Sequence, residues 1–274
     1  MRSLNRHTLP APLVLALVVV CTAQAAFAAP GLPYKVPRVD NAARAVSAPE
    51  AFAWDVFIAT NWPALAGPRG VPDAGRALGR PSKAVWETWK ASTEVFLANG
   101  AKPPGWDVPD PSTPPAGKSS LRLSDGVMLA SSADPSFVTG GLRDINGEPI
   151  YSEVRMNKIA FDHVVEHELY NVEGQLAYLA KNQRLVMPYG SIEVKVSWRI
   201  LDPVKDRSIA HRYVQTQGVL QSSGGDKRKV RLGMTGMNIM VKVLDQWFWT
   251  AFEQVDNGAQ TYDSDFPKVM LALR

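Results

Sequence analysis

The sequence contains almost no cysteine. Its single cysteine, Cys21, falls within residues 1–29, a stretch typical of a secretory signal peptide: Arg2 and Arg6 precede an apolar core, and a small-x-small cleavage site follows it. A lipoprotein anchor on Cys21 is the alternative interpretation, but Val20 stands where such a site requires a small residue. Cleavage after residue 29 removes the only thiol. The mature chain is therefore expected to lack disulfides, thiolate metal ligands and a cysteine nucleophile.

Excess charge of one sign and long apolar runs are also missing. The formal net charge is +4, and removal of the two signal-peptide arginines lowers it to about +2. Such a balance gives no indication of nucleic-acid or anionic-membrane binding, and the one dense basic run, residues 226–231, is predicted to be a solvated hairpin tip. No apolar run reaches the roughly 20 residues that a membrane span needs. We expect a periplasmic or secreted protein with no transmembrane segment in its mature part.

Common catalytic and cofactor motifs are absent from the chain. It has no G-x-S-x-G nucleophile elbow, no G-x-G-x-x-G dinucleotide motif and no calcium-loop spacing. The letters GKS at 117–119 match the end of a P-loop, but Ser112 stands where the first glycine belongs and the preceding segment is rich in proline. The sequence therefore predicts no cofactor and assigns no catalytic residue from these motifs.

The first part of the mature chain, residues 30–118, has helical patterns. Residues 47–62 predict a helix that opens with Ser47 and Glu50 in capping-box spacing. Residues 82–100 predict a second helix with a broad apolar stripe. It ends in an extended strap over residues 101–118, which hold six prolines.

The second part, residues 119–274, changes to strand patterns after one more helical stretch. A helix is predicted from residue 158 to 182, with an interruption near the NVEG sequence. Four successive strands follow, and the first of them, residues 192–200, alternates strictly between apolar and polar positions. The predicted class is α+β, with N-terminal helices beside a mainly antiparallel sheet or partly closed barrel, and both parts in one globular unit.

The sequence HVVEH offers one candidate metal site. His163, Glu166 and His167 have the H-x-x-E-H spacing of inverted zinc peptidases, and on a helix they lie within one arc. A catalytic zinc needs a third protein ligand, which only a later strand could supply, through Glu193 or Glu253. The alternative is that both histidines lie on the solvated face of an ordinary amphipathic helix, and the predicted ligand site therefore includes no metal.

A denser candidate site lies in the last predicted strand. Trp247, Trp249 and Glu253 share one face of it, which predicts a small-molecule pocket with Lys195 or Arg155 as the charge partner of the carboxylate. Arg199 and Lys242 are further candidates for that partner. A metal-free hydrolase with Glu253 as general acid or base is an alternative, and so is a plain sheet core with one buried ion pair.

Two glycines mark the strand before it. Gly233 and Gly236, in GMTGMN, predict a β-bulge or a close approach of backbone or ligand.

Several segments carry a resemblance to a known family. YSEVRMN, LYNVEGQ, GSIEVKVSW, LGMTGMNIMVKV and WFWTAFEQVDN resemble a family of uncharacterised exported bacterial proteins with the signature G-x-x-G-x-x-I … W-x-W-x-x-F-E-x-x-D-N. The resemblance covers residues 50–257. It implies a periplasmic, redox-related setting, because some members carry a cytochrome c-type haem site.

This chain departs from that family in two respects. It has no mature cysteine for covalent haem, and Asn238 stands where a histidine is expected. The functions that remain are small-molecule or partner binding, an accessory role in a periplasmic redox assembly, or the hydrolase alternatives.

Overall fold

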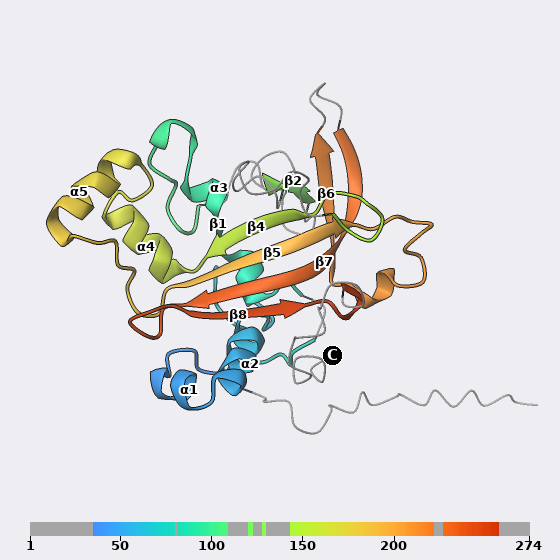
Figure 1. The fold of residues 1–274 in the computed structure, drawn as a ribbon, viewed down its shortest axis with the longest axis horizontal. Coiled ribbons are helices and arrows are strands. Elements are labelled where there is room, and N and C mark those ends of the chain that lie inside the picture. The colour runs from blue at the N-terminus through green and yellow to red at the C-terminus, as the bar shows by residue number, and fades with distance from the viewer. Residues whose placement is uncertain are drawn as a thin grey trace, which may run out of the picture. The chain divides into compact units, whose positions relative to one another are not determined.

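The described residues build one eight-stranded sheet with helices beside it (Figure 1). The computed structural model describes residues 35–79, 82–108, 120–122, 128–129, 143–221 and 227–257, and all of them belong to one compact unit. The strands are β1 (Lys90–Ala91), β2 (Ser120–Arg122), β3 (Met128–Leu129), β4 (Tyr151–Met156), β5 (Ile192–Ile200), β6 (Gln215–Gln221), β7 (Lys227–Val241) and β8 (Phe248–Glu253).

The sheet follows the order β1-β4-β5-β7-β6-β2, with β3 also beside β4 and β8 also beside β7. Every pair is antiparallel except β2 with β6. The predicted α+β class and the mainly antiparallel sheet are therefore confirmed. The four strands expected after residue 190 are β5 to β8. The basic run was predicted as a hairpin tip, but from Lys227 onward it is the start of β7, where Arg228 and Lys229 are exposed. Residues 222–226 lie outside the described residues.

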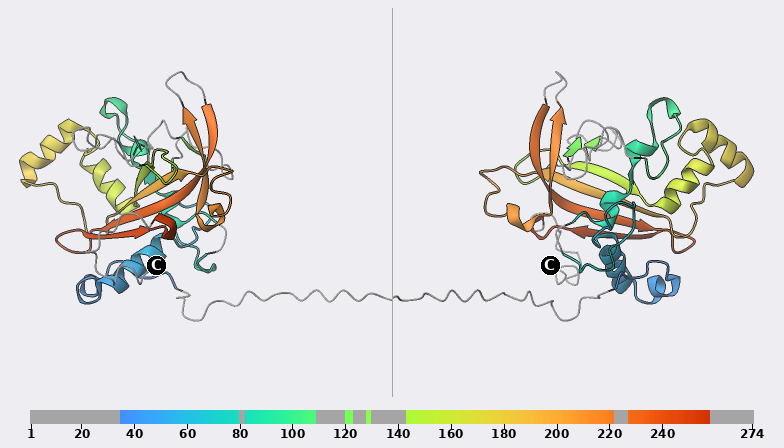
Figure 2. Two further views of the ribbon diagram at one scale, coloured as in Figure 1. Left: turned by 45° about the vertical axis from the view of Figure 1, so that its right-hand side comes forward. Right: turned by 180° about the vertical axis from the view of Figure 1, so that it is seen from behind.

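A β-bulge in β7 gives the sheet its curl. Ser197 of β5 pairs with Gly236, whereas the next residue, Trp198, pairs with Met234, so Thr235 is the extra residue. The first half of β7 pairs with β6 and the second half with β8. The two views of Figure 2 show the β6–β7 hairpin turned away from the rest of the sheet. The bulge predicted from the two glycines is confirmed, and the sheet is a curled half-barrel.

Gly233 is required beside this bulge because the chain packs tightly there. A Cβ atom at Gly233 would lie 2.8 Å from the Tyr213 ring and 3.0 Å from the Leu201 side chain. Both neighbours are buried. The close approach expected at this glycine is therefore made by protein side chains.

The described helical elements lie before β4, between the strands and at the end of the described chain. They are α1 (Ala42–Ser47), α2 (Pro49–Thr60), α3 (Ser92–Val95), α4 (Lys158–Glu166) and α5 (Val172–Asn182), with short 3-10 turns η1 (Val85–Thr88), η2 (Ala98–Gly100), η3 (Ala210–Arg212) and η4 (Val255–Asn257). None of the helices in the described ranges has the length and apolar character needed to cross a membrane.

Helix α2 covers one face of the sheet, here called the core face. Phe52 packs edge-on against Phe248 with ring centroids 4.9 Å apart, and Phe57 lies 4.4 Å from Phe252. The core face of β5 carries the fully buried side chains of Val194 and Val196. The helix predicted over residues 47–62 is confirmed, and it spans Pro49–Thr60.

The capping box expected at the start of α2 is wrong. Ser47 ends α1, and the residue before α2 is Ala48, which makes no side-chain cap. The cap is instead at the start of α1, where the Asn41 side chain accepts a hydrogen bond from the Arg44 amide. The sequence indicated the start of a single helix at Ser47, but this is where α1 ends and α2 follows.

The single helix predicted over residues 82–100 is also wrong. The segment is broken into η1, β1, α3 and η2. Two glutamate side chains accept hydrogen bonds from backbone amides, Glu87 from Ala84 and Glu94 from Ala91, and so start two separate turns. Between these turns, Lys90 and Ala91 pair with β4, while Trp86 and Trp89 are buried. Packing against the sheet overrides the helical pattern.

The helical stretch after β4 is interrupted as predicted. Helix α4 ends at Glu166, and α5 begins after Asn171, whose side chain accepts a hydrogen bond from the Gly174 amide. Glu168 in the connection has a left-handed backbone, with φ of 54°. The two helices fold into a hairpin, which Figure 1 shows beside the ends of β4 and β5. We call residues 158–182 the α4–α5 hairpin.

Candidate functional site

The floor of the candidate site is one row of side chains across four strands. Met156 of β4 pairs with Glu193 of β5, Glu193 pairs with Met240 of β7, and Met240 pairs with Trp249 of β8. Directly paired residues point to the same side of a sheet. This side is opposite the core face, because it contains the alternate residues of β5.

The walls come from segments that fold over this row. Phe96 stands on one side, Trp247 precedes β8, and the α4–α5 hairpin and the chain after it supply the remaining lining residues: Val164, Leu169, Gln175, Leu185 and Met187. Together they enclose a cavity of about 410 Å³ that opens to solvent. We call it the Trp249 pocket. Trp249 retains 67% of its surface exposed.

Glu193 is the one ionisable group among the described residues that line this pocket. Burial among methionine and leucine side chains raises the pKa of its carboxyl, and desolvation is the sole cause. No described residue forms an ion pair or hydrogen bond with the Glu193 side chain. The pocket therefore combines an apolar lining with one partly desolvated carboxylate.

The predicted aromatic residues reach this pocket, but the predicted carboxylate does not. Trp247 and Trp249 both line it. Glu253 points to the same face of β8, yet it lies four residues further along, about 13 Å at the usual rise of a strand, and is exposed. Glu193, which the sequence suggested only as a zinc ligand, occupies the place expected for Glu253.

The predicted basic partners divide between the two faces. Lys195 lies on the pocket face in the next row, opposite Asn238. Arg155 pairs with Val194, so it lies on the core face. There its Nε donates to Glu153 at 3.0 Å and its Nη1 donates to the carbonyl oxygens of Glu87 and Trp89. Arg155 therefore connects η1 to the sheet and stands away from Glu253.

The other two candidate partners are also engaged elsewhere. Arg199 forms ion pairs with Asp144 and Asp206. Lys242 donates to the backbone carbonyl oxygens of Leu244 and Asp245.

The two histidines of HVVEH pack together within the α4–α5 hairpin. Their ring centroids are 4.5 Å apart, and both rings contact Tyr178 of α5, at 5.8 Å from His163 and 5.0 Å from His167. Both are half-buried, which corrects the solvated-face interpretation; only Glu166 of the motif is exposed. Burial, and then the neighbouring His167, lower the pKa of His163.

The described residues do not complete a zinc site at these histidines. Among them, no three His, Cys, Asp or Glu side chains gather in a way that could hold a metal ion. Glu193 and Glu253 thus do not join His163 and His167. The zinc-dependent hydrolase has no third ligand in the described part of the chain.

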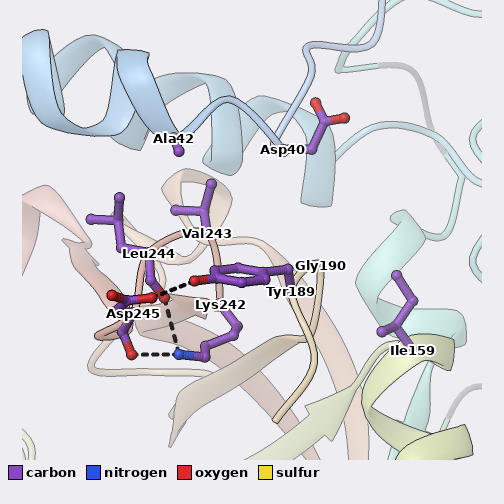
Figure 3. A pocket seen from close by; sticks show the side chains of 9 residues that line it. All are labelled: Asp40, Ala42, Ile159, Tyr189, Gly190, Lys242, Val243, Leu244 and Asp245. Carbon is purple, nitrogen blue, oxygen red and sulfur yellow. Dashed lines mark hydrogen bonds between the residues drawn. The ribbon is translucent and has the colours of Figure 1, made fainter. Parts of the chain in front are cut away.

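A second cavity, of about 670 Å³, lies between the segment before α1 and the loop after β7. Three of its polar side chains interact with one another (Figure 3): the Tyr189 hydroxyl donates to Asp245 at 2.5 Å, and Lys242 lies 5.4 Å from the Tyr189 ring. The hydrogen bond to Asp245 raises the pKa of Tyr189. This cavity offers a ligand fewer unsatisfied groups than the Trp249 pocket does.

Comparisons with known proteins find no relative of this chain. No protein-family model, no curated protein and no solved structure matches the chain. The Trp249 pocket itself is therefore the feature of this chain that points to a function.

The free carboxylate in the pocket predicts a pH-dependent effect on stability. We expect Glu193→Gln to raise the urea midpoint of unfolding at pH 7.5, because the variant removes the cost of desolvating a charge. The folded-state pKa is raised above the unfolded value of about 4.3, so wild-type stability falls as pH rises through the folded pKa. The advantage of the variant should therefore shrink as the pH approaches 4.5.

Wild type and variant should be compared at each pH, because the titration of His163 then cancels. An advantage of Glu193→Gln that stays constant from pH 4.5 to 7.5 would contradict the assignment of a desolvated carboxylate.

Proposed function

We propose that this chain is an exported protein that binds a small, largely apolar molecule in the Trp249 pocket. The observation that carries the proposal is the open cavity above the row of Met156, Glu193, Met240 and Trp249. Its volume of about 410 Å³ falls in the usual range for small-molecule sites, roughly 300–1,000 Å³. Residues 1–29 support export, and the resemblance alone supports a redox-related setting.

The lining of the pocket favours binding over catalysis. It contains no serine, threonine, cysteine, histidine or lysine among the described residues, so it offers no nucleophile beside Glu193. The three methionines have flexible, polarizable side chains that adapt to ligands of different shape. The two tryptophans supply a large contact area, and the exposed one, Trp249, gains most from being covered by a ligand.

The position of the pocket floor on the β-sheet also favours a rigid binding site. The middle of the floor lies on β5 and β7, and each of these strands is paired on both sides, β5 with β4 and β7, and β7 with β5 and β8. On the opposite, core face of β5, the neighbours of Glu193, Ile192 and Val194, are buried. A preformed floor lowers the ordering cost of binding.

A dye titration tests the proposal. The neutral apolar dye Nile red is titrated, with fluorescence detection, into protein expressed from the full coding sequence. We expect saturable binding to one site, and Trp249→Ala should weaken it roughly 10- to 150-fold, because a buried aromatic contact is worth roughly 1.5–3 kcal/mol.

Trp54→Ala is the matched control. Trp54 is also partly exposed, but it lies in α2 and contacts Phe252 on the core face. Its removal should leave the dye affinity unchanged. Equal losses in both variants, or no saturable binding in wild type, would overturn the proposal.

A further inference from the structure

The charge of the ligand follows from the charge of the pocket. Of the described residues that line the Trp249 pocket, Glu193 alone carries a charge, and it is negative. A carboxylate that is half removed from water and has no counter-charge is unfavourable on its own. A positively charged ligand would supply the counter-charge that the described residues of the pocket do not provide.

The neighbouring lysine does not neutralise this carboxylate. Lys195 lies two residues along β5 on the same face, but its Nζ forms no ion pair with Glu193. Opposite Lys195, β7 presents the neutral Asn238. On either side of Glu193 itself stand Met156 and Met240, which cannot neutralise a charge.

The aromatic side of the pocket suits a cation as well. Cations bind over the faces of tryptophan rings, and aromatic cages recognise quaternary ammonium groups in this way. Glu193 and Trp249 stand two strands apart, about 10 Å between their Cα atoms, with Met240 between them. A head group that rests on Met240 can contact both the carboxylate and the indole ring.

We propose that the Trp249 pocket binds an organic monocation, an amine or quaternary ammonium with an apolar body, whose charge pairs with Glu193. The head group lies between the carboxylate and the tryptophans, and the apolar body lies against Leu169 of the α4–α5 hairpin and against Leu185 and Met187 in the chain after it. This inference rests on the proposed function, to which it adds the chemical class of the ligand.

Three octyl compounds of equal chain length test the charge preference. Octyltrimethylammonium, 1-octanol and octanoate are titrated into the full chain at pH 7.5 by isothermal calorimetry, with ligand-induced shifts in melting temperature as a second readout. We expect octyltrimethylammonium to bind roughly tenfold more tightly than 1-octanol, and octanoate to bind most weakly because it meets a like charge.

Glu193→Gln separates the charge from the pocket. The variant keeps the shape of the side chain and removes its charge, so it should lose the preference for octyltrimethylammonium over 1-octanol. Lys195→Gln is the control on the same face, and the preference should survive in it. Retention of 1-octanol binding shows that the Glu193→Gln pocket is intact.

The outcomes distinguish the ligand class from the proposed function. If all three compounds bind wild type equally, or 1-octanol or octanoate binds best, the cationic ligand is excluded while the binding function stands. If none of the three binds and Nile red does not bind either, the proposed function fails. A preference that persists in Glu193→Gln would move the cation site away from this carboxylate.

Discussion

Arg199→Met is expected to lower the free energy of unfolding by about 3–5 kcal/mol. In the folded protein, the Arg199 Nε lies 2.8 Å from Asp144 and its Nη2 lies 2.9 Å from Asp206, and the three side chains are at most 2% exposed. Methionine fills a similar volume but leaves two carboxylates buried without their cation. Urea unfolding at pH 7.5, followed by circular dichroism, measures the loss.

Two further variants make this prediction specific. Lys158→Met removes a charge from an exposed i,i+4 pair with Asp162, so it should change stability little. Adding Asp144→Asn and Asp206→Asn to Arg199→Met should recover part of the loss, since no buried charge then remains unpaired. If the triple variant is no more stable than Arg199→Met alone, the loss does not come from unpaired carboxylates.

Gly174→Ala is expected to lower the free energy of unfolding by about 2–3 kcal/mol. A Cβ atom at Gly174 would lie 2.1 Å from the Glu168 carbonyl oxygen and 2.6 Å from its carbonyl carbon. Both are backbone atoms, so the connection between α4 and α5 would have to move. The neighbouring residue, Gln175, lines the Trp249 pocket and donates to the Leu169 carbonyl oxygen at 2.8 Å.

The displacement should therefore affect the pocket wall before it affects the sheet. Relative to wild type, Gly174→Ala should increase the rate of amide hydrogen exchange more in α5 than in β5, and it should weaken Nile red binding. Gly105→Ala is the control: its Cβ would meet only the Val108 side chain, at an ordinary 3.8 Å. Equal effects of the two alanine substitutions would show that the contact at Glu168 is not decisive.

The Trp249 pocket also places function and stability in opposition. Glu193→Gln is expected to stabilise the folded protein at neutral pH and to remove the preference for a cation. An unpaired, partly desolvated carboxylate is unfavourable without a ligand. Its presence at the centre of the pocket is what a binding site for a positive group requires, and natural proteins commonly sacrifice stability at such positions.

Strand positions could be read from the sequence because alternation is a local property. In β5, Ile192, Val194, Val196 and Trp198 alternate with polar residues, and the structure buries all four. The glycines of GMTGMN likewise indicated the bulge, since a bulge needs local backbone freedom or close approach. The same alternation placed Trp249 and Glu253 on one face of β8.

The helical pattern of residues 82–100 failed because competing local and long-range contacts decide that segment. Glu87 and Glu94 cap the backbone within two short turns, and the intervening Lys90–Ala91 pair joins the sheet through β4. The apolar spacing is similar for a helix and for this broken segment. The location of β4 relative to it could not be read from the spacing.

The sequence by itself determined the class of the fold, the four strands after residue 190 and the presence of aromatic side chains on the face of β8 that lines the pocket. Only the tertiary structure decided that Glu193, rather than Glu253, shares that pocket, that Arg199 is buried between two aspartates, and that His163 and His167 pack against Tyr178. Alternation fixes which face a side chain occupies. Whether that face meets water, an opposite charge or a second helix depends on segments distant in sequence, such as the α4–α5 hairpin that folds over one end of the sheet.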